Sequence, residues 1–106
     1  AEWDVLMTAV GGANTAGTKL KAKSGWNDYQ GASGNGTDEY GFSALPGGDG
    51  YSDGSFSNVG SNGDWWSATE HSASVAYGRN LYYDFSNVNS YVFNKSYLWS
   101  VRCLQD

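Results

Sequence analysis

The chemistry that this chain of 106 residues could perform centres first on its single histidine, His71. It follows Glu70, and serines are plentiful, so the residue types of a Ser–His–carboxylate hydrolytic site are present. Such a site also needs a nucleophile signature such as the G-x-S-x-G elbow, and we find no such elbow in the sequence. We therefore interpret His71 as a surface or ligand-contacting residue and expect no enzymatic activity.

Acidic residues in the glycine-rich middle of the chain could supply oxygen ligands to a calcium ion. The stretch Asp49 to Gly54, "DGYSDG", offers two carboxylates and flexible carbonyls, and Asp38 and Glu39 could add further oxygens. However, the stretch lacks the regular ligand spacing and the final glutamate of an EF-hand loop. Aspartate also closes turns through hydrogen bonds to its own backbone, so we expect turn residues here, no bound metal and no cofactor.

The chain has one cysteine, Cys103, which excludes an internal disulfide and a zinc site built from several thiolates. Two interpretations remain open. Cys103 is either a buried thiol that packs as a small hydrophobic residue or one half of a disulfide whose partner lies upstream of the present start.

The last part of the chain combines aromatic residues with asparagine and serine, as in "YYDFSNVNSYVFNKSYLWSVRCL" from Tyr82 to Leu104. A strand built only for a core would alternate valine, isoleucine and leucine with polar residues. The combination seen here is typical of contact surfaces, where aromatic side chains supply rigid area and small polar ones supply adaptable hydrogen bonds. It predicts a recognition surface in this segment.

Composition limits the classes of partner and indicates a single loop-rich domain spanning residues 1–106. There are 15 glycines and one proline, but five Trp, eight Tyr and four Phe provide enough burial to fold. The net charge of −5 leaves no basic surface for nucleic acid or for anionic membranes. No apolar run is long enough to insert into a membrane. The chain opens directly in a helical pattern, so we expect it to be part of a larger polypeptide.

Two helices are predicted before the glycine-rich region. The residues at positions i, i+3, i+4 and i+7 of the first helix are Trp3, Leu6, Met7 and Val10. Gly11-Gly12 should end this helix, and a second helix is expected from Thr15 to Lys23 with Leu20 facing inward.

An antiparallel sheet is predicted after the turn-rich stretch from Ser24 to Gly63, which contains one strand-like piece from Phe42 to Leu45. Its four strands are expected at 64–70, 76–84, 87–93 and 96–104, the last two forming a hairpin around "NKS". The side chains expected to face the core are Trp65 or Trp66, Leu81, Tyr83, Trp99, Val101 and Cys103. Helices followed by an antiparallel sheet make this an α+β domain.

Six phrases occur in an order that resembles the Fibrobacter succinogenes major paralogous domain family of bacterial secreted and surface proteins. They are "AEWDVLMTAVGG", "TAGTKLK", "GTDEYGFSALPGG", "GSFSNVGSNGDWWSATE", "RNLYYD" and "NKSYLWSVRCL". The resemblance implies a compact C-type-lectin-like fold, related to the formylglycine-generating enzyme group, with two helices packed on a small twisted sheet and long glycine-rich loops. It also implies secretion or display on the bacterial cell surface. Members of the family usually begin earlier, with a segment like "GWRLPTD".

The sequence also resembles hypervariable proteins that diversity-generating retroelements rewrite at asparagine codons. Where many relatives read "YYDNSNVNRNNNNKSYGFSVRC", this chain reads "YYDFSNVNSYVFNKSYLWSVRC". The departures are Phe85, Ser90, Tyr91, Val92, Phe93, Leu98 and Trp99. Residue types that the same process produces also occur at Asp64, His71, Ser74, Val75 and Gly78. Ordinary drift between paralogues is the alternative origin.

Together these patterns predict a non-enzymatic extracellular recognition domain, adhesin-like, that binds an unknown protein or glycan. The predicted ligand-binding residues are Asp64, His71, Ser74, Val75, Gly78, Tyr82, Phe85, Ser90, Tyr91, Val92, Phe93 and Leu98. The apolar members should form one exposed patch, with Asp64, His71, Val75 and Gly78 at its margins. The alternative is a carbohydrate-binding module of a polysaccharide-degrading bacterium. A coplanar Trp/Tyr strip would favour sugar, whereas a mixed apolar face would favour protein.

Overall fold

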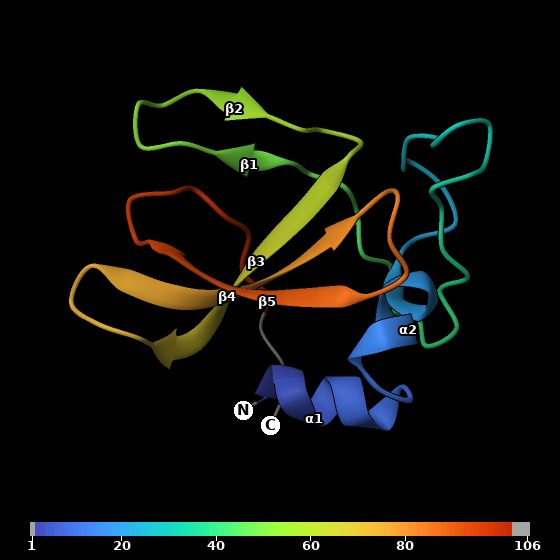
Figure 1. The fold of residues 1–106 in the computed structure, drawn as a ribbon, viewed down its shortest axis with the longest axis horizontal. Helices are drawn as coiled ribbons and strands as arrows, with labels where there is room; N and C mark the ends of the chain where they lie inside the picture. The colour runs from blue at the N-terminus through green and yellow to red at the C-terminus, as the bar shows by residue number, and fades with distance from the viewer. Residues whose placement is uncertain (1, 103–106) are drawn as a thin grey trace.

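The computed structural model describes residues 2–102, which form an α+β domain as predicted. Two helices, α1 (Glu2–Ala9) and α2 (Ala13–Leu20), come first. Five strands follow: β1 (Asp49–Gly50), β2 (Phe56–Ser57), β3 (Asn62–Glu70), β4 (Val75–Tyr82) and β5 (Val88–Asn94). The α1 helix lies on one side of the larger sheet and the β1–β2 hairpin on the other (Figure 1).

The helical periodicity correctly predicts how α1 docks. Met7 and Val10 are buried, and Trp3 and Leu6 pack partly buried against the same core. The helix ends because Gly11 and Gly12 both adopt positive φ, which residues with a side chain rarely do. Helix α2 lies slightly earlier in the chain than predicted and stops before Lys21, whose backbone is extended.

Strands β3, β4 and β5 form an antiparallel sheet with β4 in the centre. We call the face that meets the helices the inner face. It contributes Trp65, Leu81 and Val88 to the core, where they join Leu20 of α2. Trp65 and Leu81 were both predicted core residues, and Tyr83 packs against the core only partly buried.

The glycine-rich stretch between α2 and β3 is held by backbone hydrogen bonds rather than by regular structure. The predicted strand from Phe42 to Leu45 is reduced to one bridge between Lys21 and Ala44. The Ala44 carbonyl also accepts the indole N–H of buried Trp26 at 2.9 Å. Acidic residues close turns here as predicted, since Asp38 accepts from Ser43 and Asp53 from Ser55.

The predicted hairpin between the last two strands is wrong. A turn follows β5, with the Tyr97 N–H bonded to the Asn94 carbonyl at 3.1 Å, but the chain then leaves β5. Leu98 pairs with Gly50 of β1, and Ser100 pairs in parallel with Trp65 at the outer edge of β3. Residues 97–100, the crossing segment, therefore run beside β1 and the free edge of β3, and the Trp99 ring reaches over the second face of the sheet, which we call the outer face.

The crossing segment also changes where its side chains point. Trp99 packs on the outer face, directly over Gly78, where any Cβ would overlap its ring. Val101 is 66% exposed, so the prediction that it faces the core is wrong. Both errors follow from treating the segment as a sheet strand with regular alternation. Cys103 lies outside the described residues.

Candidate recognition face and an adjoining pocket

Six aromatic rings contact one another across the outer face. Trp66 and Trp99 stack with ring centroids 4.7 Å apart, and the Phe93 ring centroid also lies 4.7 Å from that of Trp99. Tyr91 and Tyr97 each contact Phe93, and Tyr97 reaches the β1–β2 hairpin through Tyr51. These residues, here called the aromatic cluster, are Tyr51, Trp66, Tyr91, Phe93, Tyr97 and Trp99.

Register explains why these rings meet. Trp66, Gly78 and Tyr91 are direct partners across β3, β4 and β5, so they share the outer face. Glycine at the central position leaves a gap above the backbone, and the Trp99 ring fills it from the crossing segment. A two-residue step along each strand places Asp64, Asn80 and Asn89 beside this row.

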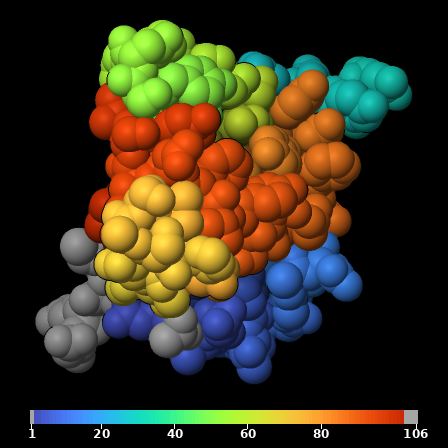
Figure 2. Space-filling view, turned by 60° about the vertical axis from the view of Figure 1, so that its left-hand side comes forward, coloured from blue at the N-terminus to red at the C-terminus, as the bar shows by residue number. Residues whose placement is uncertain are grey.

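Exposed apolar side chains adjoin the aromatic cluster. Tyr91 is 43% exposed, Leu98 51% and Phe56 71%. Leu98 and Phe56 both lie against Gly50, where an added Cβ would come within 2.7 Å of Leu98 and 2.9 Å of the Phe56 ring. The β1–β2 hairpin, β5 and the crossing segment form a continuous surface in Figure 2.

The predicted ligand-binding residues do not form one patch. Those of the outer face and crossing segment are Asp64, Gly78, Tyr82, Tyr91, Phe93 and Leu98. Those that alternate to the inner face are Val75, Ser90 and Val92. His71 and Ser74 lie in the turn between β3 and β4, and Phe85 lies in the loop between β4 and β5.

Burial corrects several expectations of exposure. Asp64 and Gly78 are buried, so neither is the exposed margin that was predicted. The crossing segment is the physical cause at Gly78, which lies beneath Trp99. Phe93 and Tyr82 are half-buried, whereas Phe85, Tyr91, Val92 and Leu98 are exposed as predicted.

Sequence reasoning missed Tyr51, Phe56 and Tyr97 as part of this face. They lie on the β1–β2 hairpin and the crossing segment, and no local pattern relates those two segments. Trp66 and Asn80 could have been found, because strict alternation along β3 and β4 places them with Asp64 and Gly78.

A buried polar pair lies beside the aromatic cluster. Asp64 is 3% exposed and Asn80, its cross-strand partner, is 2% exposed. The Asn80 side-chain N–H donates to the Tyr82 hydroxyl at 3.1 Å. The pKa of the Asp64 carboxyl is raised to about 7, chiefly by burial and then by the negative charge of Asp49, against an opposing hydrogen bond from Asn80. Burial also raises the pKa of Tyr82.

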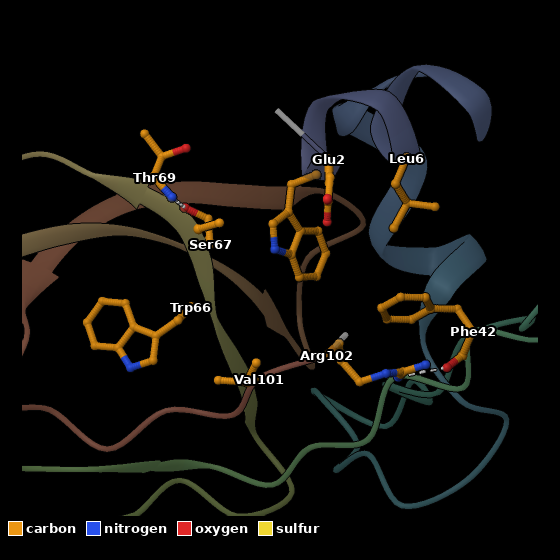
Figure 3. A pocket seen from close by; sticks show the side chains of 10 residues that line it. Glu2, Leu6, Phe42, Trp66, Ser67, Thr69, Val101 and Arg102 are labelled. Atoms are coloured by element: carbon orange, nitrogen blue, oxygen red, sulfur yellow. Dashed lines mark hydrogen bonds between the residues drawn. The ribbon is translucent and has the colours of Figure 1, made fainter. Parts of the chain in front are cut away.

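A pocket of about 430 Å³ lies between α1, the second half of β3 and residues 101–102 (Figure 3). Trp3, Leu6, Phe42 and Trp66 give it apolar walls. The Arg102 guanidinium lies 4.1 Å from the centre of the Phe42 ring and donates to the Phe42 carbonyl at 3.0 Å. The pocket could accept an apolar group, and Trp66 connects it to the aromatic cluster.

The serine motif and the single histidine can now be placed in the structure. Residues 50–54, "GYSDG", fit the letters of the G-x-S-x-G motif, but they form the end of β1 and the turn that follows, and no helix comes after them within the described residues. The His71 ring contacts Tyr77 at 5.5 Å. Within residues 2–102, no three side chains from His, Cys, Asp and Glu gather as a metal site, and no helix could cross a membrane.

Comparison with known proteins identifies a family. Neither a curated protein nor a solved structure matches this sequence. The family model for the Fibrobacter succinogenes major domain matches residues 1–105, nearly the whole chain. The chain therefore belongs to the Fibrobacter succinogenes major domain family.

Proposed function

We propose that this chain is a non-enzymatic, adhesin-like recognition domain that acts outside the bacterial cell and binds a protein ligand through its outer face. The observation that supports this most is the continuity of exposed Tyr91, Leu98 and Phe56 with the aromatic cluster. A folded domain rarely leaves apolar side chains together on its surface unless they bind something.

The arrangement of the rings favours protein over sugar. Sugar rings stack on a flat platform, but Tyr91 and Phe93 are inclined at 89° and Tyr51 and Tyr97 at 86°. Trp66 and Trp99 are nearly parallel, at 28°, yet they stack on each other and are half-buried. Exposed Leu98 adds an aliphatic group that suits a protein interface.

Carbohydrate binding is the second candidate, because aromatic rings stand beside carboxylate and amide groups. Against it, Asp64 and Asn80 are almost fully buried and could not reach the hydroxyls of a bound sugar without rearrangement. The polar groups needed to orient a sugar would therefore have to come from elsewhere on the face.

A retroelement origin for the variable residues fits part of the outer face. Tyr91 and Phe93 lie there, away from the core beneath the helices, so substitution at these two positions would alter surface contacts. Asp64 and Gly78 share that face but are buried, so substitution there would also change stability. A reverse transcriptase gene and an imperfect repeat of the C-terminal coding segment in neighbouring DNA would support this origin. Their absence would favour ordinary paralogue drift.

The class of ligand can be tested by incubating the purified domain with a glycan array and with an array of bacterial and host surface proteins. We expect reproducible binding to proteins that is lost in a Tyr91→Ala/Leu98→Ala variant. Val5→Ala is the matched control, because Val5 is 70% exposed but lies on α1. Selective binding to glycans would replace the proposal with the carbohydrate-binding alternative.

A further inference from the structure

Three buried polar atoms without hydrogen-bond partners occur among the described residues, and all three belong to the outer face. They are Asp64 Oδ2, Asn80 Oδ1 and Trp99 Nε1. Asp64 and Asn80 face each other across β3 and β4, and Trp99 covers the neighbouring Gly78. Buried polar atoms are nearly always paired with protein, ordered water or an ion. The two oxygens, of Asp64 and Asn80, could face a cation, whereas the Trp99 indole N–H is a donor and could not coordinate one.

A buried carboxylate needs a compensating charge, and no basic side chain of the described chain provides one for Asp64. Each of the six basic side chains in the sequence is engaged or placed elsewhere. Three of them donate to backbone carbonyls: Lys19 to that of Val10, Lys21 to those of Tyr82 and Phe85, and Arg102 to that of Phe42. The other three interact with carboxylates: Arg79 with Asp4, Lys95 with Glu70, and Lys23, through its charge, with Asp38. Asp64 is therefore either protonated or balanced by a cation from outside the protein.

A second carboxylate increases this need. Gly48 and Gly63 pair in parallel, so Asp49 and Asp64 are the next residues along two adjoining chains. Asp49 is half-buried and accepts one hydrogen bond on Oδ1 from Asn58 at 2.8 Å. The strand pairing thus brings two carboxylate residues and Asn80, whose amide oxygen is unpaired, to the junction of β1 with β3.

We propose that Asp49, Asp64 and Asn80 bind a calcium ion at this junction, beside the aromatic cluster. Carboxylate and amide oxygens are the ligands that calcium prefers, and it tolerates irregular geometry better than magnesium does. Because Asp49 is only half-buried, water could complete the coordination of the ion. The ion would fix the β1–β2 hairpin against the sheet, and hence Tyr51 and Phe56 against the rest of the face.

No sequence motif predicts this site, because its ligands come from three separate strands rather than from one loop. Calcium binding here would not depend on the nature of the recognised ligand.

Terbium luminescence and thermal melting test the proposal on the purified domain at pH 8. Tb³⁺ bound here should be sensitised by the neighbouring Tyr82 and by Trp99, and excess Ca²⁺ should displace it. After EDTA treatment, saturating Ca²⁺ should raise Tm by at least about 5 °C, and Mg²⁺ by much less. Asp64→Asn and Asp49→Asn should each abolish both effects, whereas Asp28→Asn, which removes an exposed carboxylate, should retain them.

The competing source of positive charge is a proton on Asp64. If a proton neutralises Asp64, added Ca²⁺ leaves the Tm of the wild type unchanged at pH 8, whereas the Asp64→Asn substitution raises the Tm. This pair of results would overturn the proposal. Equal Tb³⁺ luminescence in Asp64→Asn and Asp28→Asn would also overturn it, because the ion would then bind adventitiously at the surface. If the Asp64→Asn variant fails to fold, Asp49→Asn is compared with Asp28→Asn instead, because Asp49 is only half-buried.

Discussion

The two faces of the three-stranded sheet are built on different principles. On the inner face, Trp65, Leu81 and Val88 meet two helices, and apolar side chains pack against apolar side chains. On the outer face, rings from the sheet meet rings from the hairpin and the crossing segment, and buried polar atoms remain unpaired between them. The inner face holds the fold together, and the outer face carries the features of a site.

The largest loss of stability is expected from truncating a core residue. Leu20 is fully buried between α2 and the sheet, so Leu20→Ala should lower the free energy of unfolding by about 2–5 kcal/mol through lost burial and a cavity. Urea denaturation followed by tryptophan fluorescence measures this loss. A loss no larger than that of an exposed substitution would show that the helices are not packed on the inner face.

Gly78→Ala should have the next largest effect, and it acts from the outer face alone. The added methyl group would overlap the Trp99 ring and force the crossing segment away, at a cost of about 1–3 kcal/mol. Separation of the stacked Trp66 and Trp99 rings should weaken the near-UV circular dichroism. An unchanged spectrum with unchanged stability would contradict the position of the crossing segment.

Asp64 should make stability depend on pH in the absence of divalent cations. Its pKa is about 7 in the folded protein and 3.8 in the reference state, so the folded protein binds this proton more tightly. Stability from this group is therefore present at low pH and is lost as pH rises from about 4 to above 7, by about 1.4 kcal/mol per pKa unit of difference.

The contribution of Asp64 is isolated by subtracting the pH profile of Asp64→Asn, measured by urea denaturation in EDTA, from that of the wild type. The difference should fall with rising pH across this window. A difference in stability that does not change with pH would show that Asp64 is solvated and that the outer face is more open than described.

Val101→Ala should have the smallest effect, within about 0.5 kcal/mol of the wild type, because the side chain is 66% exposed. This expectation reverses the one drawn from alternation along the segment. If urea denaturation shows that the free energy of unfolding falls by more than about 2 kcal/mol, Val101 is a core residue after all.

The inner face was more predictable from sequence than the outer face, for a physical reason. The spacing of Leu6, Met7 and Val10 reflects a helix with one buried side, and that relation is local. The meeting of Leu98 with Gly50, or of Trp99 with Gly78, depends on how distant segments cross, which no local periodicity encodes. The exposure of Tyr91 and Leu98 was predicted because they lie opposite the residues expected to face the core or close to the expected turn. Buried Asp64 was missed because its cover comes from elsewhere in the fold.

The central claim is that the outer face binds ligand while the inner face only supports it. The most direct test is the affinity of Tyr91→Ala and Val5→Ala for the strongest binder found on the protein array, measured by surface plasmon resonance. Tyr91→Ala should weaken binding by about 30-fold, corresponding to about 2 kcal/mol at an aromatic anchor, while Val5→Ala leaves Kd unchanged and both variants remain folded. Equal affinities for the two folded variants would contradict the claim and move the search for the binding site to the pocket beside α1.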